Sequence, residues 1–463
     1  MNTLEYMKLF MEPRSVAIIG LSRRSGRGSP DILDALKHMG FQGEIYPVNP
    51  HANNIGGTKA YPDMASLPVS PDVAVIVTPR HIVPQVVKDC VEKGIKAITV
   101  FAQGFADADA RGKELQEEVV VRIARRGGAR VMGPNTVGSA NPYVGFTSGL
   151  ARLDFYRLPT GFIAQSGSLV ITLADWGILG KSIDLGNTCD IDFADALEYF
   201  EDDPQVKVVG IHMEGLSNAK RFIEVAGRFV RKKPLIVLKT GRSEQGTKAA
   251  RSHSGSIAGS HETYSAIFNQ LGILRAADLE ELGDLMKAFA FLPAMAGRRV
   301  GVAAHSGGAG IIAVDVAERY GIEMPHFAPE TIAALKPIFP EWQTLDNPLD
   351  TWPAVFTSGH PSYAYKACLQ AVLADESVDG VFFTAAAFNR AKKWSVSEPV
   401  LEAAEKFSDK PIVCCLQGPL YVRETGILEK TQRIACFPSP DRAIRALARM
   451  ADYAEFKREQ LRS

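Results

Sequence analysis

Short apolar runs rich in β-branched residues alternate with amphipathic segments along the whole 463-residue chain. Strands are predicted at residues 15–20, 44–48, 73–77, 97–101 and 129–133. The same alternation begins again with predicted strands at 161–164, 206–211 and 235–238, and a third time at 299–304, 380–384 and 411–415. Continuous apolar strands separated by helices are typical of parallel sheets covered on both faces. The pattern predicts an α/β protein of three doubly wound domains, at 1–150, 151–296 and 297–463.

The composition is that of an ordinary globular protein, with 46% hydrophobic and 22% charged residues. Lys plus Arg and Asp plus Glu each number 52, which disfavours nucleic acid and membrane surfaces as partners. The six cysteines form no CxxC pair and have no metal-ligand spacing, so we expect reduced thiols and no metal site. The N-terminus lacks a signal-peptide pattern, and no apolar run approaches the roughly 18 residues that span a bilayer. A cytoplasmic protein is expected.

The first predicted strand runs into a loop of small and basic residues, 20–30, which leads into a helix. Such a loop offers backbone N–H groups and the positive end of a helix dipole to a phosphate. Its arginines, Arg23 and Arg24 among them, add charge for more than one phosphate group. NAD sites usually carry an acidic residue after the second strand, but here that strand ends Asn49-Pro50. NAD is therefore disfavoured and coenzyme A, with its additional phosphate, fits better; a polar connecting loop is the alternative.

Other strand ends of the first segment carry small or polar residues. They are Thr78-Pro79, Gln103-Gly104 and Asn135. Ligands of parallel sheets bind beyond the carboxyl ends of the strands. Each of these turns is ordinary by itself, and together they predict a lined crevice.

Two strand ends of the second segment carry groups suited to phosphoryl chemistry. Gln165-Ser166-Gly167-Ser168 follows a strand and starts a helix, which predicts an anion cradle or, alternatively, a plain N-cap. Glu214 ends another strand. Its carboxylate could accept a hydrogen bond from an imidazole N–H and leave the second ring nitrogen free to attack, or it could simply face solvent.

A glycine-rich, basic stretch at 238–259 carries one histidine, His253. The small neighbours of His253 leave room for a large polar ligand. Four cations favour an anion there: Lys239, Arg242, Lys248 and Arg251. The alternative is a solvated basic loop with an incidental histidine.

Eight short motifs occur in order between about residues 12 and 290. They are residues 15–20, 46–50, 133–135, 165–168, 185–187, 214–215, 239–242 and 252–256. In these motifs the chain resembles the α part of the nucleotide-diphosphate-forming acyl-CoA synthetases, relatives of succinyl-CoA synthetase. The resemblance implies a Rossmann-like CoA-binding domain followed by a flavodoxin-like ligase domain. Residues 306–310 and 346–350 extend it to a second flavodoxin-like domain, which in succinyl-CoA synthetase belongs to the β subunit.

The resemblance also implies an activity and a set of site residues. Acid, CoA and ATP would become acyl-CoA, ADP and phosphate, through a phosphohistidine at His253 and an acyl phosphate. Glu214 would orient the imidazole, and Gln165, Ser166, Gly167, Ser168, Ser254 and Gly255 would hold the phosphoryl group. CoA would bind at Gly20, Ser22, Arg23, Arg24, Ser25, Asn49, Pro50, Thr78, Pro79, Gln103, Gly104 and Asn135.

The chain departs from the family pattern in several places. No stretch resembles an ATP-grasp domain, so a separate ATP-grasp β subunit is expected, in a heterotetramer, with ATP and Mg²⁺ bound there; a homodimer is the other possible assembly. Thr136 stands where the family often has cysteine, and Ser254 where it often has threonine. His305 stands where asparagine is expected and either tunes the choice of substrate, a small carboxylic acid, or is neutral.

Two other functions stay open at this point. A non-catalytic CoA-binding regulatory or scaffold protein would keep the fold, but it would have no use for the pairing of His253 with Glu214. A nucleotide-dependent dehydrogenase is disfavoured by the missing carboxylate after Val48.

Overall fold

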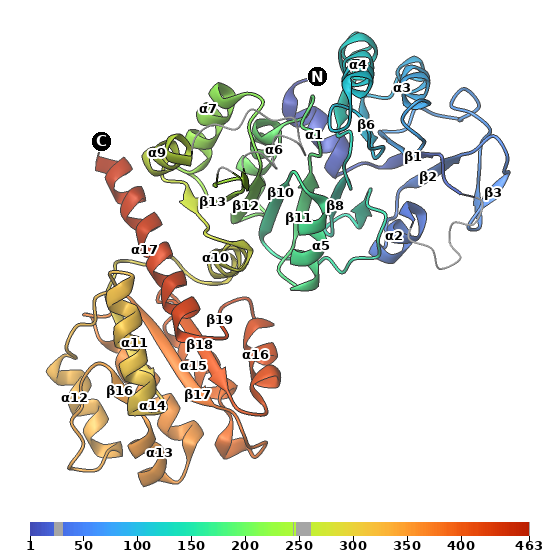
Figure 1. Cartoon of the computed structure of the whole chain (residues 1–463). Helices are drawn as coiled ribbons and strands as arrows, with labels where there is room; N and C mark the ends of the chain where they lie inside the picture. The colour runs from blue at the N-terminus through green and yellow to red at the C-terminus, as the bar shows by residue number, and fades with distance from the viewer. Residues whose placement is uncertain (23–30, 244, 247–260, 463) are drawn as a thin grey trace. The chain divides into compact units, whose positions relative to one another are not determined.

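The computed structural model describes residues 1–22, 31–243, 245–246 and 261–462. It divides into two compact units, Met1–Leu282 and Gly283–Ser463 (Figure 1). Each predicted strand is present, with ends shifted by at most two residues, and the α/β prediction is confirmed. All six cysteines are free thiols. No helix within the described ranges combines the length and the apolar character needed to cross a bilayer.

The first sheet of unit 1 is parallel and five-stranded, in the order β2-β1-β5-β6-β7. The strands are β1 (Ser15–Ile19), β2 (Glu44–Val48), β5 (Val73–Ile76), β6 (Ala97–Val100) and β7 (Arg130–Met132). The helices of this part are α1 (Thr3–Met11), α2 (Ile32–Met39), α3 (Val83–Glu92), α4 (Ala110–Glu117) and the π-helix η1 (Glu118–Arg125), and β3 (Asn54–Ile55) pairs with β4 (Thr58–Lys59). The strand order reverses between β1 and β5, which is where a parallel sheet opens a ligand crevice.

Local sequence explains these elements. The four residues of β5 are all buried, and a continuous apolar strand is what a sheet with both faces covered requires. Helix α2 begins at the N-cap Asp31, whose side chain accepts a hydrogen bond from the backbone N–H of Asp34. It ends at Gly40, which takes the left-handed conformation with a φ of 75°.

The second sheet of unit 1 has seven strands, in the order β14-β13-β12-β10-β11-β8-β9. The strands are β8 (Ser139–Asn141), β9 (Phe146–Thr147), β10 (Thr160–Ala164), β11 (Lys181–Asp184), β12 (Val208–Met213), β13 (Leu235–Lys239) and β14 (Leu274–Arg275). Its helices are α5 (Gly167–Asp175), α6 (Phe193–Glu201), α7 (Ala219–Phe229) and α9 (His261–Leu271), and α10 (Leu279–Phe291) spans the border between the units. The strand order reverses between β10 and β12.

Two features tie the second sheet to the first. Strands β8 and β9 run antiparallel at the edge of the second sheet, although they fall within residues 1–150. The buried side chain of Asp190 accepts hydrogen bonds from Arg130 Nε at 2.8 Å and from the backbone N–H of Val131 at 2.8 Å. These bonds join the loop after β11 to β7. The division at residues 150 and 296 stays a prediction.

Unit 2 contains a third sheet, parallel and five-stranded, in the order β16-β15-β17-β18-β19. The strands are β15 (Val300–Ala304), β16 (Leu349–Asp350), β17 (Gly380–Ala386), β18 (Ile412–Gln417) and β19 (Ala435–Cys436). The helices are α11 (Gly307–Arg319), α12 (Pro329–Leu335), α13 (Trp352–Ser358), α14 (Pro361–Ala374), α15 (Ser397–Lys406), α16 (Tyr421–Glu429) and α17 (Pro440–Arg462), with the 3-10 helices η2 (Lys336–Ile338) and η3 (Lys392–Trp394).

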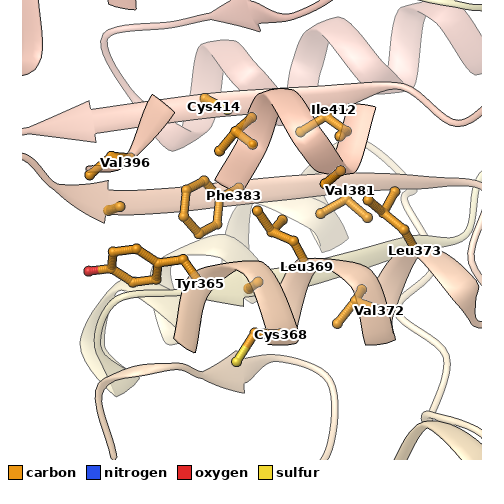
Figure 2. Close-up of a cluster of buried hydrophobic side chains, with 14 of the residues drawn as sticks. Tyr365, Cys368, Leu369, Val372, Leu373, Val381, Phe383, Val396, Ile412 and Cys414 are labelled. Carbon is orange, nitrogen blue, oxygen red and sulfur yellow. The ribbon is translucent and has the colours of Figure 1, made fainter. Parts of the chain in front are cut away.

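One buried cluster of unit 2 includes residues of α14 and of the sheet. Tyr365, Leu369 and Val372 of α14 belong to the same buried cluster as Val381 and Phe383 of β17 (Figure 2). The rings of Tyr365 and Phe383 meet edge to face, with centroids 5.5 Å apart. Fully buried aromatic and aliphatic side chains of this kind supply the main favourable term in folding.

Candidate functional site

The turn between β10 and α5 joins two neighbouring strand ends of the second sheet. Gln165 is buried, and its Oε1 accepts hydrogen bonds from the backbone N–H groups of Glu214 at 2.6 Å and Gly215 at 3.1 Å. Ser166 is the N-cap of α5, but its hydroxyl pairs with the Ser168 hydroxyl at 2.9 Å and caps no backbone N–H. The start of α5, with its positive dipole end, therefore lies beside Glu214 at the point where the strand order reverses.

A buried lysine supports the same edge from β13. Lys239 is 4% exposed, and its Nζ donates to the backbone oxygens of Glu214 at 2.8 Å and Thr240 at 2.5 Å. Burial lowers the pKa of Lys239, and the nearby Glu214 carboxylate opposes part of that effect. Next to it, His212 Nε2 lies 3.2 Å from the Thr240 hydroxyl. The carboxyl ends of β12 and β13 therefore bring an acid, a lysine and a histidine together.

These groups line a cavity of about 880 Å³. Its lining residues are Ser166, Leu169, His212, Glu214, Leu238, Lys239, Thr240, Gly241, Arg242, Ser243, Gly246, Ala277, Asp278 and Leu279. Two predicted site residues, Ser166 and Glu214, thus face one cavity. Of the basic residues singled out in the 238–259 stretch, Lys239 and Arg242 also reach it.

A second cavity, of about 780 Å³, lies between the two sheets of unit 1. Its lining residues are Val77, Phe101, Ala102, Gln103, Asp107, Asn135, Thr136, Val137, Leu150, Gln165, Ser166, Gly167, Ser168 and Asp184. The predicted CoA positions Gln103 and Asn135 therefore share this cavity with the predicted phosphoryl positions 165–168. Ser166 lines both cavities, so the two adjoin at the start of α5.

The structure also describes the other residues that are predicted to bind CoA. Several of them lie where the strand order of the first sheet reverses, between β1 and β5. Gly20 follows β1 with a φ of 96°, and a Cβ there would lie 2.7 Å from the Thr78 side chain after β5. Only glycine allows this close approach without strain. Asn49 follows β2, and its Nδ2 donates to the Leu21 backbone oxygen at 2.7 Å. Gly20, Ser22, Asn49, Pro50, Thr78, Pro79 and Gly104 do not belong to the lining of the 780 Å³ cavity.

Two carboxylates that line the 780 Å³ cavity, Asp107 and Asp184, are not predicted as site residues from the sequence. Asp107 accepts hydrogen bonds from the backbone N–H groups of Gly104 at 3.1 Å and Phe105 at 2.9 Å, and from Asn187 Nδ2 at 2.8 Å. Burial would raise the pKa of Asp107, but these bonds outweigh it and the pKa is lowered. Asp184 ends β11, and burial raises its pKa to about 6. No signal pointed to Asp184 because β11 was not predicted as a strand.

Some predicted residues lie outside the described part of the chain. They are His253, Ser254, Gly255, Arg23, Arg24 and Ser25. Their roles stay predictions.

His305 lies in unit 2, directly after β15. Its Nδ1 is 3.2 Å from the Thr384 hydroxyl in β17, at the reversal point of the third sheet. Burial lowers the pKa of His305, and Asp350 opposes part of that effect. Its effect on substrate choice stays a prediction.

Two family models match the chain between residues 14 and 289. Residues 14–142 match a CoA binding domain, and residues 158–289 match a succinyl-CoA ligase like flavodoxin domain. The chain is also similar to relatives of about its own length. The ADP-forming acetate–CoA ligase I subunit alpha of Pyrococcus furiosus is 34% identical over 97% of this chain and 98% of its own length.

Two further relatives extend the comparison. The ADP-forming acetate–CoA ligase II of Archaeoglobus fulgidus is 35% identical over 90% of this chain, which spans only 62% of that longer protein. A solved structure of the Ca. Korarchaeum cryptofilum dinucleotide forming acetyl-coenzyme A synthetase 1, in complex with phosphate and ADP, superimposes with a TM-score of 0.88. It is 32% identical and covers 99% of both chains. The chain therefore belongs to the ADP-forming acetate–CoA ligase family, as a catalytic α subunit of an ADP-forming acyl-CoA synthetase.

Proposed function

We propose that this subunit carries the acyl-CoA and phosphate half of the reaction through a phosphohistidine at His253. The observation that supports it most is the position of Ser166, which lines both the cavity with Glu214 and the cavity with Gln103 and Asn135. A phosphoryl group at the start of α5 would be within reach of both. The resemblance then assigns Glu214 to orient the imidazole of His253 and Ser254 and Gly255 to the phosphoryl group.

The proposed chemistry proceeds in two transfers. The carboxylate of a small acid attacks phosphorus, so the P–N bond to His253 breaks and an acyl phosphate forms. The CoA sulfur then attacks the carbonyl carbon, the C–O bond breaks, and phosphate leaves. Backbone N–H groups at the helix start stabilise charge on the transferred group, and binding brings thiol and carbonyl together.

The partner supplies the remaining half. We propose a separate ATP-grasp β subunit, assembled with this chain in a heterotetramer, that binds ATP and Mg²⁺ and phosphorylates His253. Relatives named as acetate–CoA ligases make acetate the first acid to test. The six free thiols favour a cytoplasmic setting, where thiols stay reduced.

The phosphohistidine can be tested on the chain itself. Incubation with acetyl-CoA and radiolabelled phosphate is expected to give an acid-labile, alkali-stable label on the protein. The His253→Ala variant is expected to lose that label, because the substitution removes the imidazole nitrogen that would receive the phosphoryl group. His326→Ala is the matched control, since the His326 side chain is 92% exposed and lies in unit 2. A label that persists in His253→Ala would place the phosphoryl group on another residue.

A further inference from the structure

The motif Leu185-Gly186-Asn187, in the loop after β11, has no part in the function proposed above. Backbone hydrogen bonds hold it on both sides. The Leu185 N–H donates to the Ala164 oxygen at 2.8 Å, and the Asn187 N–H donates to the Pro134 oxygen at 3.0 Å. A Cβ on Gly186 would lie 2.3 Å from the Pro134 oxygen, so a side chain does not fit at this position. The motif therefore lies between the end of β10 and the turn after β7.

The side chain of Asn187 contacts three residues of the part of unit 1 that contains the first sheet. Its Nδ2 donates to Asp107 Oδ1 at 2.8 Å and to Gln116 Oε1 at 3.2 Å. Its Oδ1 accepts a hydrogen bond from Asn135 Nδ2 at 3.5 Å. An amide has two N–H donors and one oxygen, and here all of them are used. Asn187 therefore connects the loop after β11 with the loop after β6 and the turn after β7.

Asp107 links Asn187 to a turn that is predicted to bind CoA. Its two oxygens accept the backbone N–H groups of Gly104 and Phe105, as described above. Burial acts to raise the pKa of Asp107, but its hydrogen bonds, that from Asn187 first, lower the pKa overall. Asp107 is therefore ionised near neutral pH, and a hydrogen bond to an ionised acceptor is stronger than one to a neutral acceptor. Gln103, next to this turn, and Asp107 both line the 780 Å³ cavity.

We propose that Asn187 and Asp107 are positioning residues for CoA and its thioesters. Asn187 holds the Asp107 carboxylate and the Asn135 amide, and Asp107 holds the turn that carries Gln103. The inference rests on the proposed function, in which CoA binds at Gln103 and Asn135. It goes further by giving two residues that are not predicted as site residues from the sequence a part in CoA affinity.

The physical basis of this role is preorganisation. A loop that becomes ordered only when its ligand binds lowers the affinity, and hydrogen bonds that order the loop beforehand remove that cost. The contacts of Asn187 and Asp107 are made by the protein alone. Their loss is therefore expected to weaken the binding of CoA and of acetyl-CoA. The reaction of bound acetyl-CoA is expected to stay the same, because it depends on the groups at the start of α5.

Asn187→Asp tests the contact because it replaces only the amide nitrogen with an oxygen. Two carboxylates then face each other at hydrogen-bond distance and repel. Titration calorimetry near neutral pH is expected to show a Kd for CoA that is raised by about 10-fold or more. In the labelling assay with radiolabelled phosphate, the KM for acetyl-CoA is expected to rise by a similar factor while kcat changes by less than about 2-fold.

A double variant separates this contact from a general loss of structure. Asp107→Asn alone is expected to weaken CoA binding, because its amide N–H₂ faces a backbone N–H that has lost its acceptor. Combined with Asn187→Asp, it restores a pair of one amide and one carboxylate in exchanged positions. The double variant is therefore expected to bind CoA at least about 3-fold more tightly than Asn187→Asp alone. A double variant that binds more weakly than Asn187→Asp would overturn the inference.

Asn269→Asp is the matched control, because it adds the same charge at an exposed asparagine of α9 in unit 1. Its Kd for CoA is expected to stay within about 2-fold of the wild type. Thermal unfolding shows whether each variant is folded. If Asn187→Asp does not fold, Asn187→Ala removes the contact without adding a charge and is expected to raise the Kd by about 5-fold or more.

The outcomes distinguish this inference from the proposed function. A folded Asn187 variant with an unchanged Kd for CoA would overturn the inference and leave the proposed function standing. So would a variant with a lower kcat and an unchanged KM for acetyl-CoA. A wild-type protein that binds CoA but takes no label from acetyl-CoA and phosphate would instead contradict the proposed phosphohistidine, and the calorimetric test of Asn187 would still apply.

Discussion

At the scale of single residues, buried polar groups separate what pattern reading found from what it missed. β11 carries Lys181, Ser182 and Asp184, and all three are buried. Lys181 is held by an ion pair with Asp203, with Nζ and Oδ2 2.5 Å apart. Because buried charges are tolerated when they are paired, a strand with this composition is stable in the fold. The sequence of β11 lacks the apolar run that indicates a buried strand.

Asp184 also predicts a pH dependence of stability. Burial raises its pKa in the folded protein to about 6, from an ordinary value of 3.8. A raised carboxyl pKa contributes stability below the unfolded pKa, and that contribution is lost as pH rises through the folded pKa. Between pH 4 and pH 7 the wild type is therefore expected to lose about 2 kcal/mol of unfolding free energy relative to Asp184→Asn.

Urea unfolding of both proteins at a series of pH values in that range measures this difference. Asp184→Asn is the right reference because the amide keeps the shape of the side chain and does not titrate. Parallel stability curves for the two proteins would contradict the raised pKa.

At the scale of elements, the turn between β10 and α5 connects the fold to the site. Gln165 bridges this turn to the end of β12, and the start of α5 faces both cavities. The motif 165–168 was read from the sequence as a strand followed by a helix start, and the structure has that form. The hydrogen bond from the Glu214 backbone N–H to Gln165 Oε1 joins residues 49 positions apart, so no local sequence pattern predicts it.

Gln165→Leu tests the role of this bridge. The substitution leaves the backbone N–H groups of Glu214 and Gly215 without their acceptor in a buried setting. It is expected to cost about 2–4 kcal/mol of stability and to slow protein labelling, because Glu214 loses its support. Thermal unfolding and the phosphate-label assay measure the two effects.

Gln205→Leu is the matched control, since Gln205 is an exposed glutamine of the same unit. A surface change of this kind is expected to stay within about 0.5 kcal/mol. Equal stability of the Gln165 and Gln205 variants would show that the bridge is unimportant.

At the scale of the whole molecule, each of the two compact units has its own sheets and its own buried residues. The cluster in unit 2 includes residues of α14 and β17 (Figure 2). The residues that line the candidate site belong to unit 1. A loss of packing in unit 2 should therefore act first on unit 2. Calorimetry can measure whether the two units unfold in separate transitions.

Phe383→Ala makes that loss. Phe383 is fully buried, and its truncation is expected to cost about 3–5 kcal/mol and to lower the unfolding transition of unit 2. CoA binding to unit 1 is expected to remain. Phe356→Ala, at a phenylalanine 82% exposed on α13, is the control and is expected to change stability little. A uniform shift of the whole unfolding profile in Phe383→Ala would show that the units unfold together.

The sequence by itself determined the α/β class, the strands whose residues are continuously apolar, and the family. A strand that is apolar throughout indicates that both faces of its sheet are buried. Motifs that occur in a fixed order over nearly 300 residues indicate membership of one family. Tertiary structure decided which strand ends share a cavity, that β8 and β9 join the second sheet antiparallel, and that Asp184 lines the same cavity as Gln103 and Asn135. Those properties arise from pairing between residues far apart in the chain. In β11 a buried ion pair replaces the apolar pattern that sequence reading detects.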